Sequence, residues 1–187
     1  SDVALPIYKY NYIYYIMNLR ENIKKVLREE TESLPQPKIT PIVEVILMGG
    51  LDYRSGDLKI GEQINLLKSS SSKKNIIGYR YNQFQEIKNA IIQNPNATVV
   101  LFSAGCSYAS NVASLIKNKN KLFIVEPYAI SKNTSSSVQS AVNKGVPSSH
   151  VITGPSKARG LGVVDGATKT PKGKSHWDAL AYVGTLI

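Results

Sequence analysis

A short stretch of the chain places three potential nucleophiles where an apolar segment ends. The run VVLFSAGCSYAS, residues 99–110, contains Ser103, Cys106 and Ser107 among glycine and alanine. A hydroxyl or a thiol becomes an effective nucleophile when a nearby base removes its proton. Small neighbours allow the sharp strand-to-helix turn that lifts such a side chain clear of a sheet. We therefore take this stretch as the candidate centre for nucleophilic chemistry.

Among the three, Ser107 is the favoured nucleophile. Small residues flank it on both sides, whereas Ser103 is expected to belong still to the preceding strand and is the alternative. Cys106 is the only cysteine, so the chain forms no internal disulfide, and we expect a buried, inert thiol.

A serine nucleophile needs a base, and the chain has 2 histidines. We expect His150 to open a strand, at the amino end of the sheet and away from the candidate nucleophiles. His176 lies in KSHWDALAYVG, where Ser175 and Asp178 have the spacing of a capping box that starts a helix. His176 is thus the favoured base, and the alternative is that it only packs or caps.

Between Ser107 and His176 the sequence contains two carboxylates, Glu126 and Asp165. Glu126 is expected at the carboxyl end of a strand and is the favoured acid, and Asp165 is the alternative. Either could instead be structural, Glu126 in an ion pair and Asp165 as a turn residue before Gly166.

The segment from Gly105 to Ala109 resembles the nucleophile elbow of the α/β-hydrolase superfamily, whose pattern is G-x-S-x-G. Ala109 stands at the second glycine of that pattern. The resemblance implies a triad in the chain order nucleophile, acid, histidine, and thus a serine esterase or lipase that forms an acyl-enzyme. The resemblance also extends to Glu126, which follows the strand after the elbow and precedes a proline. The acid of the pancreatic-type lipases has the same position.

The same resemblance implies backbone N–H groups that stabilise an oxyanion. The first donor is expected from Tyr108, which follows Ser107. The second is expected from Gly50 or Leu51 in the loop MGGLDYRSGD, although Met48 stands where the family often has histidine.

The elements around these residues alternate between apolar strands and amphipathic helices. Strands are predicted over 43–48, 75–79, 98–102, 122–125 and 150–153, with a possible short one over 161–164. Helices are predicted over 59–68, 83–93, 108–117, 136–144 and after His176. Strands rich in Val, Ile and Leu without polar alternation are buried on both faces. The sequence therefore predicts an α/β-hydrolase-like, three-layer α/β domain with a mostly parallel sheet.

The first 41 residues have a different pattern. Tyr8, Tyr10, Tyr12 and Tyr14 alternate as in a strand, and Asn18 is a candidate N-cap for a helix over 18–32. SLPQPKITP follows as a proline-rich linker. We thus expect an N-terminal extension over 1–41 and a single catalytic-type domain over 42–187. No signal peptide and no run long enough to span a bilayer are recognised, so a cytoplasmic location is the default expectation.

The formal net charge of +10 favours no single function. An apolar content of 42% in 187 residues is enough to bury one core and makes disorder unexpected. Two alternatives to a hydrolase of small or polymeric esters stay open: a non-enzymatic α/β binding or assembly module, for instance a viral one, and a nucleic-acid-binding protein. The second would use a basic loop containing Lys157, Arg159, Lys169, Lys172 and Lys174.

No cofactor and no metal site are expected, since the two histidines and one cysteine form no zinc-like cluster.

Overall fold

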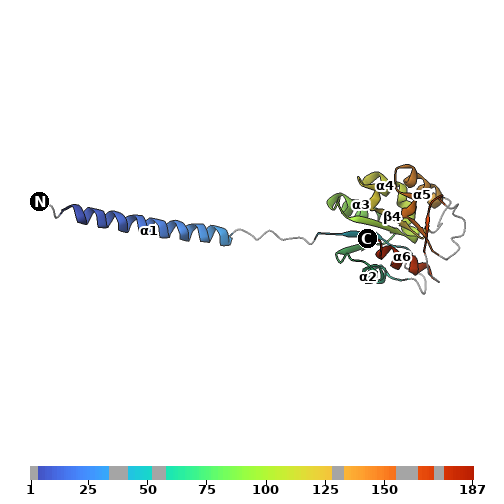
Figure 1. Ribbon diagram of the computed structural model, residues 1–187, viewed down its shortest axis with the longest axis horizontal. Helices are drawn as coiled ribbons and strands as arrows, with labels where there is room; N and C mark the ends of the chain where they lie inside the picture. The colour runs from blue at the N-terminus through green and yellow to red at the C-terminus, as the bar shows by residue number, and fades with distance from the viewer. Residues whose placement is uncertain (1–3, 34–41, 52–57, 128–132, 155–163, 171–174) are drawn as a thin grey trace. The chain divides into compact units, whose positions relative to one another are not determined.

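A computed structural model describes residues 4–33, 42–51, 58–127, 133–154, 164–170 and 175–187 (Figure 1). Within helix α1, side chains are described for residues 14–28. The chain separates into two compact units, residues 1–40 and residues 41–187.

The second unit is built on one parallel sheet. Its strands are β1 (Val45–Met48), β2 (Ile76–Tyr79), β3 (Thr98–Phe102), β4 (Leu122–Val125), β5 (Val151–Thr153) and β6 (Thr168–Lys169). Their order in the sheet is β2-β1-β3-β4-β5-β6, and every pair is parallel. The predicted three-layer α/β class with a parallel sheet is confirmed.

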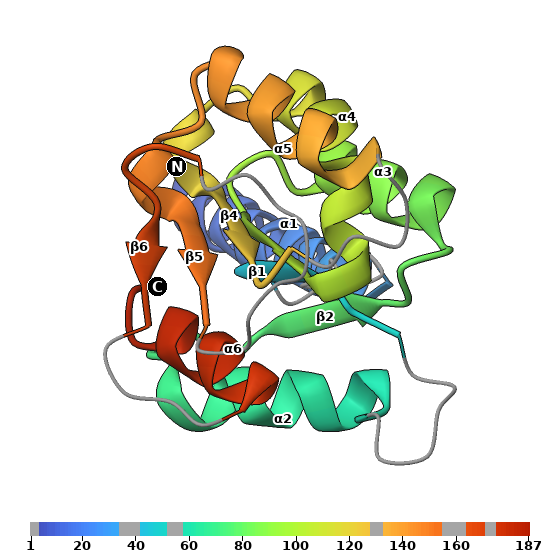
Figure 2. The ribbon, with the colours of Figure 1, turned by 90° about the vertical axis from the view of Figure 1, so that its right-hand side faces the viewer.

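Helices cover both faces of this sheet, as Figure 2 shows. On one face lie α3 (Phe84–Gln93), α4 (Ala109–Leu115) and α5 (Asn133–Asn143), with Ile87, Val112 and Val138 in the core. On the other face lie α2 (Ile60–Ser70) and α6 (His176–Gly184), with Leu67 and Leu180 in the core. Burial on both faces is why β1 and β4 consist of apolar residues without polar alternation.

The strand order creates a switch point between β1 and β3. The chain leaves β1 for β2 on one side and returns to β3 on the other, so the loops after β1 and β3 diverge. In open parallel sheets, ligands bind beyond the carboxyl ends of the strands at such a point. The loop of Gly49 and Gly50 and the segment that begins at Ser103 meet there.

The predicted strands and helices of this unit differ from the observed ones mainly at their ends. A short 3₁₀ helix, η1 (Ser103–Tyr108), separates β3 from α4, and two more, η2 (Lys119–Lys121) and η3 (Ser148–His150), precede β4 and β5. The possible strand over 161–164 falls on residues outside the described part except Val164, which is not in a strand. The observed β6 was not predicted, because Thr168 and Lys169 carry no apolar signal.

The first unit contains the 30-residue helix α1 (Ala4–Ser33). The predicted tyrosine strand was wrong, and so was the N-cap at Asn18, because the helix runs through both. Tyr8, Tyr12 and Tyr15 also have the three-to-four spacing of one helix face, which the alternation concealed. No helix among the described residues is both long and apolar enough to cross a membrane.

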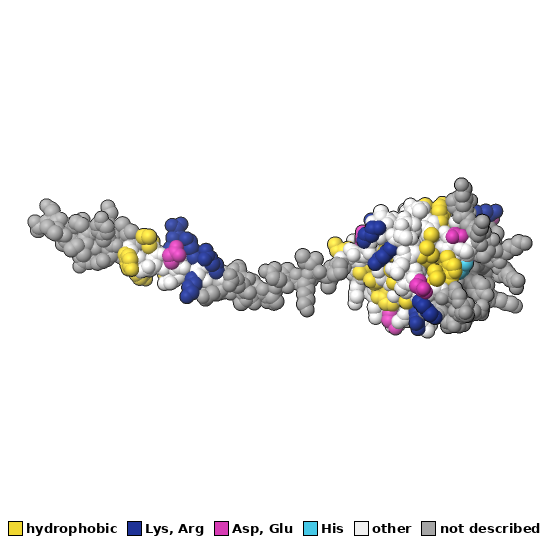
Figure 3. Space-filling view, turned by 90° about the horizontal axis from the view of Figure 1, so that it is seen from below, with side chains coloured by type: hydrophobic (Ala, Val, Ile, Leu, Met, Phe, Trp, Pro, Cys, Tyr) yellow, Lys and Arg dark blue, Asp and Glu magenta, His cyan; other side chains and the backbone are white. Residues whose placement is uncertain are grey.

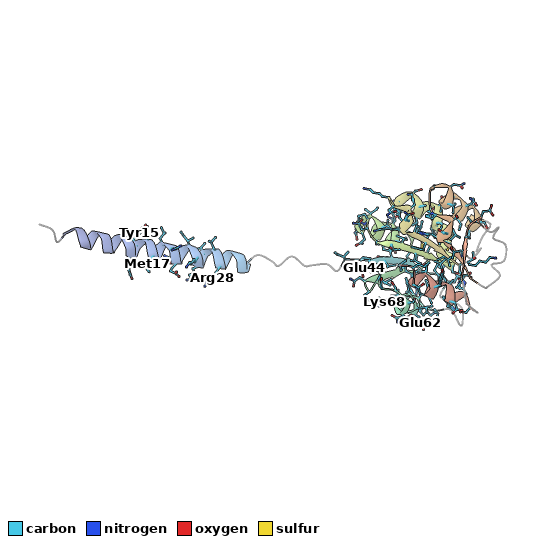
Figure 4. All side chains as sticks on the ribbon, in the orientation of Figure 1. Tyr15, Met17, Arg28, Glu44, Glu62 and Lys68 are labelled. Carbon is cyan, nitrogen blue, oxygen red and sulfur yellow. The ribbon has the colours of Figure 1, made fainter. Side chains whose placement is uncertain are left out.

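A single carboxylate holds the amino ends of β1 and β2 together. Glu44, labelled in Figure 4, accepts hydrogen bonds from the N–H groups of Asn75 at 3.1 Å and Lys74 at 3.0 Å. Its other oxygen lies 3.8 Å from the Lys73 ammonium group. These contacts favour the charged form and lower the pKa of Glu44, the Asn75 hydrogen bond contributing most, Lys74 next and Lys73 less.

We predict that Glu44→Gln destabilises the protein at neutral pH and has little effect in acid. The folded pKa lies below the unfolded one, so the contribution is present above the unfolded pKa and is lost as pH falls through the folded value. Urea unfolding of both proteins at pH 7 and pH 3 measures the difference. Glu86→Gln on α3 is the control, and an equal loss of stability at both pH values would contradict the role of the charge.

Candidate active site

The loop after β1 lies directly against the residue that follows β3. A Cβ added to Gly50 would lie 2.8 Å from the Ser103 Cβ and 3.2 Å from its hydroxyl oxygen. Such distances are too short for an ordinary side chain, so the close approach requires glycine. Gly105 is confined in the same way, since its Cβ would lie 2.6 Å from the Met48 carbonyl oxygen. The small residues of this stretch thus let η1 pack against the end of β1.

Ser103 has a backbone conformation that few non-glycine residues adopt. Its φ of 53° lies in the left-handed region, which costs about 1–3 kcal/mol and occurs preferentially at functional sites. Ser103 begins η1, so the N–H of Ala104 lies in the first turn, where N–H groups lack partners within the helix. The residue is only 6% exposed, and its hydroxyl forms no hydrogen bond with any described residue.

Glu126 follows β4 and is the second described non-glycine residue with positive φ, at 47°. Its backbone N–H bonds to the Ile152 carbonyl at 2.7 Å, which ties it to β5. Its side chain is 2% exposed, and one carboxylate oxygen accepts the backbone N–H of Gly154. A buried charge needs such partners.

His176 donates to the second oxygen of that carboxylate. Its Nδ1 lies 2.9 Å from Glu126 Oε2. An ionised carboxylate only accepts, so Nδ1 carries a proton, and in the neutral ring the lone pair is then on Nε2. The ring belongs to the first residue of α6, where the Ser175 N–H bonds Asp178 Oδ2 at 2.7 Å in the predicted capping box.

An aromatic contact brings the imidazole next to the serine strand. The His176 ring packs on the Phe102 ring with centroids 4.7 Å apart, and Phe102 immediately precedes Ser103. Trp177 contacts both rings, at 5.4 Å from His176 and 5.3 Å from Phe102. The His176 side chain remains 27% exposed, so the ring is partly accessible to solvent. Ser103, Glu126 and His176 therefore gather at the carboxyl edge of β3, β4 and β5.

The favoured nucleophile of the sequence analysis lies elsewhere in the turn. The Ser107 hydroxyl donates to the Ala104 carbonyl at 2.9 Å and forms no hydrogen bond with His176. Tyr108 stacks on Phe84 of α3 at 4.6 Å, on the sheet face opposite the His176 cluster. The geometry thus favours Ser103 over Ser107.

Cys106 is buried, and its thiol donates to the carbonyls of Leu101 and Val125. Burial, the largest cause, raises the pKa of this thiol far above its ordinary value. It is thus a poor nucleophile, as predicted.

Asp165 and His150 lie at the amino edge of the sheet. Asp165 is exposed in the turn before β6, beside Gly166 with its φ of 82°. His150 stacks on Phe123 at 4.2 Å, with Nδ1 3.2 Å from the Leu122 carbonyl. Neither meets the Ser103 cluster, because the strands are parallel and their amino ends lie at the opposite edge.

The sequence predicted the backbone N–H groups of Gly50 and Leu51 as donors to an oxyanion, and only one of them is without a partner among the described residues. The Gly50 N–H bonds the buried Gln63 Oε1 at 3.1 Å, and Gln63 in turn donates to the Leu58 carbonyl at 2.7 Å. The Leu51 N–H bonds no described residue. Gln63 and Gly154 are the supporting residues that the sequence analysis missed, because neither belongs to a recognisable motif.

Within the described residues, no group of three or more His, Cys, Asp or Glu side chains could hold a metal ion. Lys169 is exposed in β6, and the other basic-loop residues, Lys157, Arg159, Lys172 and Lys174, lie outside the described part.

Comparison with known proteins found no matching family model, no matching curated protein and no matching solved structure.

We predict that Gly154→Ala destabilises the protein and breaks the Glu126–His176 hydrogen bond. The added Cβ would lie 2.7 Å from the carboxylate carbon of Glu126, so the carboxylate must move. Urea unfolding and the downfield imidazole N–H proton in NMR spectra measure both effects. Gly61→Ala in α2 is the control, since its Cβ meets nothing within 4 Å, and should stabilise by up to about 1 kcal/mol. An unchanged imidazole resonance in Gly154→Ala would contradict the prediction.

Proposed function

We propose that the protein is a serine hydrolase that cleaves carboxylic esters through an acyl-enzyme. Ser103 is the nucleophile, His176 the general base and acid, and Glu126 the residue that orients the imidazole. The observation that carries the proposal is the buried Glu126–His176 hydrogen bond at the sheet edge where Ser103 has a strained left-handed backbone.

The first chemical step is acylation. Ser103 Oγ attacks the ester carbonyl carbon while His176 Nε2 takes the hydroxyl proton. The carbonyl oxygen becomes an oxyanion, and the backbone N–H groups of Ala104 and Leu51 are the available donors, each worth about 3–4 kcal/mol when well placed. The tetrahedral intermediate then expels the alcohol, which receives the proton from Nε2.

The second step is deacylation. Water attacks the acyl carbonyl as Nε2 removes its proton, and Ser103 leaves with the proton that Nε2 returns. Throughout, Glu126 holds Nδ1–H and stabilises the imidazolium that forms in each step. The Ser103 hydroxyl has no hydrogen-bond partner among the described residues, so no existing hydrogen bond must break before it donates to a base. Catalytic hydrogen bonds commonly tighten only when substrate binds.

Chain order and strand position support a relationship to the α/β-hydrolase superfamily. The order Ser103, Glu126, His176 matches the family order, and the serine stands in a sharp strand-to-helix turn beside the loop of an earlier strand. The motif around Ser103 is L-F-S-A-G, which keeps the trailing glycine, Gly105, and has Leu101 at the leading one. Leu101 is fully buried within β3, which ends at Phe102, so the turn begins at the serine itself.

We predict that Ser103→Ala abolishes hydrolysis of short p-nitrophenyl esters and that Ser107→Ala retains it. Loss of a catalytic serine removes the acylation step, and rates fall by at least about 10³-fold in comparable triads. Ser107→Ala is the matched control because the two residues lie in the same 3₁₀ helix and lose the same atom. Initial rates of p-nitrophenol release measure both. The reverse pattern would return the role to Ser107, and wild-type rates in both variants would exclude both serines.

We predict that Glu126→Gln lowers kcat by about 10²–10⁴-fold with little change in KM. Its amide group can present N–H to the ring and then favours the wrong imidazole tautomer. The steady-state constants measure this split between kcat and KM, with Glu86→Gln as the control for removing a surface carboxylate. A loss confined to KM would contradict the orienting role.

A further inference from the structure

The long helix α1 has an apolar face that is exposed within its own unit of residues 1–40. Ile16, Leu19, Ile23 and Val26 are 43%, 44%, 51% and 52% exposed. They are separated by three, four and three residues, which puts them on one side of an α-helix. Figure 3 shows hydrophobic and basic side chains on the surface of this helix. A helix in water gains most of its stability from packing such a face, so α1 needs a partner.

The spacing is that of the a and d positions of a coiled-coil heptad. Ile16 and Ile23 take position a, and Leu19 and Val26 take position d. Toward the amino end of α1, the next d positions are Tyr12 and Leu5, and the neighbouring a positions are the charged residues Lys9 and Glu30, so the apolar part of the repeat covers residues 12–26. β-branched residues at a with leucine at d favour a parallel pair of helices. The face is therefore self-complementary: each a and d side chain meets its own copy.

The flanks of this face also fit a parallel pair. Tyr15 stands at position g and Arg20 at the e position five residues later, which are the positions that meet across a parallel coiled coil. Each Tyr15 ring would thus lie beside Arg20 of the partner subunit, a cation–π pair formed twice by symmetry. In an antiparallel pair, e positions meet e positions and g positions meet g positions, so Tyr15 and Arg20 would not face each other.

The charge of α1 argues against a lipid surface as the partner. Helices that lie on membranes carry a polar face dominated by Lys and Arg. α1 contains Lys9, Arg20, Lys24, Lys25 and Arg28 against Glu21, Glu29, Glu30 and Glu32, so its charges nearly balance. Charges of both signs beside apolar a and d positions are typical of helices that pair with helices.

We propose that α1 of one chain pairs with α1 of a second copy in a parallel two-stranded coiled coil, making the protein a dimer. The pairing does not depend on the proposed hydrolase activity, since α1 belongs to the separate unit of residues 1–40.

The test is the oligomeric state of the full chain by sedimentation equilibrium at about 100 µM, where even modest affinities populate a dimer. The wild type should have twice the monomer mass. The double variant Ile16→Glu with Ile23→Glu should be a monomer, because it puts charges into the a positions. Met17→Glu is the matched control: Met17 is 62% exposed and apolar, and Figure 4 shows it on the side of α1 opposite Tyr15. This variant should remain a dimer.

Cysteine cross-linking tests the orientation. Under mild oxidation, Ile16→Cys should give a covalent dimer and Met17→Cys should not, because only a parallel in-register pair brings residue 16 next to its own copy. Cys106 is buried and contributes no cross-link.

Several results would overturn the proposal. They are a monomeric wild type, a wild type larger than a dimer, a dimer that survives both glutamates, dissociation by Met17→Glu, and no cross-link through Ile16→Cys. A monomeric wild type that sediments with phosphatidylglycerol vesicles would identify the apolar face as a lipid-binding surface instead.

Discussion

The candidate site depends on one hydrogen bond, between the buried carboxylate of Glu126 and the imidazole of His176. Glu126 is 2% exposed and would be costly to bury alone, and His176 is the side chain that meets it at 2.9 Å. The pair joins the end of β4 to the start of α6, fifty residues apart in sequence. Its geometry fixes the imidazole tautomer and directs the free nitrogen away from the carboxylate. Any chemistry proposed for this edge of the sheet relies on that orientation.

Close backbone packing makes room for the pair and for the serine. Gly154 leaves space for the Glu126 carboxylate, and Gly50 lets the β1 loop lie against Ser103. The strained backbone at Ser103 and Glu126 is maintained by the sheet on which both stand. Strain at two neighbouring strand ends, beside a histidine, is expected where a fold is arranged for reaction rather than for stability alone.

The sequence predicted the parallel α/β sheet well, because apolar strands buried on both faces leave a clear pattern. It also singled out Glu126 and His176, which the structure brings into contact, because the chain offers few carboxylates and histidines to choose from. The choice between Ser103 and Ser107 could not be made from small neighbours alone. It depends on where β3 ends and η1 begins, and that boundary is set by packing of Gly105 against Met48, a contact distant in sequence. The prediction of a strand over the tyrosines of α1 was wrong because alternation over a few residues fits both a strand and part of a helix.

Covalent labelling with a fluorophosphonate, followed by peptide mapping, tests the account most directly. Such a reagent phosphonylates a serine only when a base activates its hydroxyl and N–H donors hold the phosphonyl oxygen. The account predicts one adduct, on Ser103, that is lost when His176 is replaced by alanine. An adduct on Ser107, or no adduct on the folded protein, would contradict it.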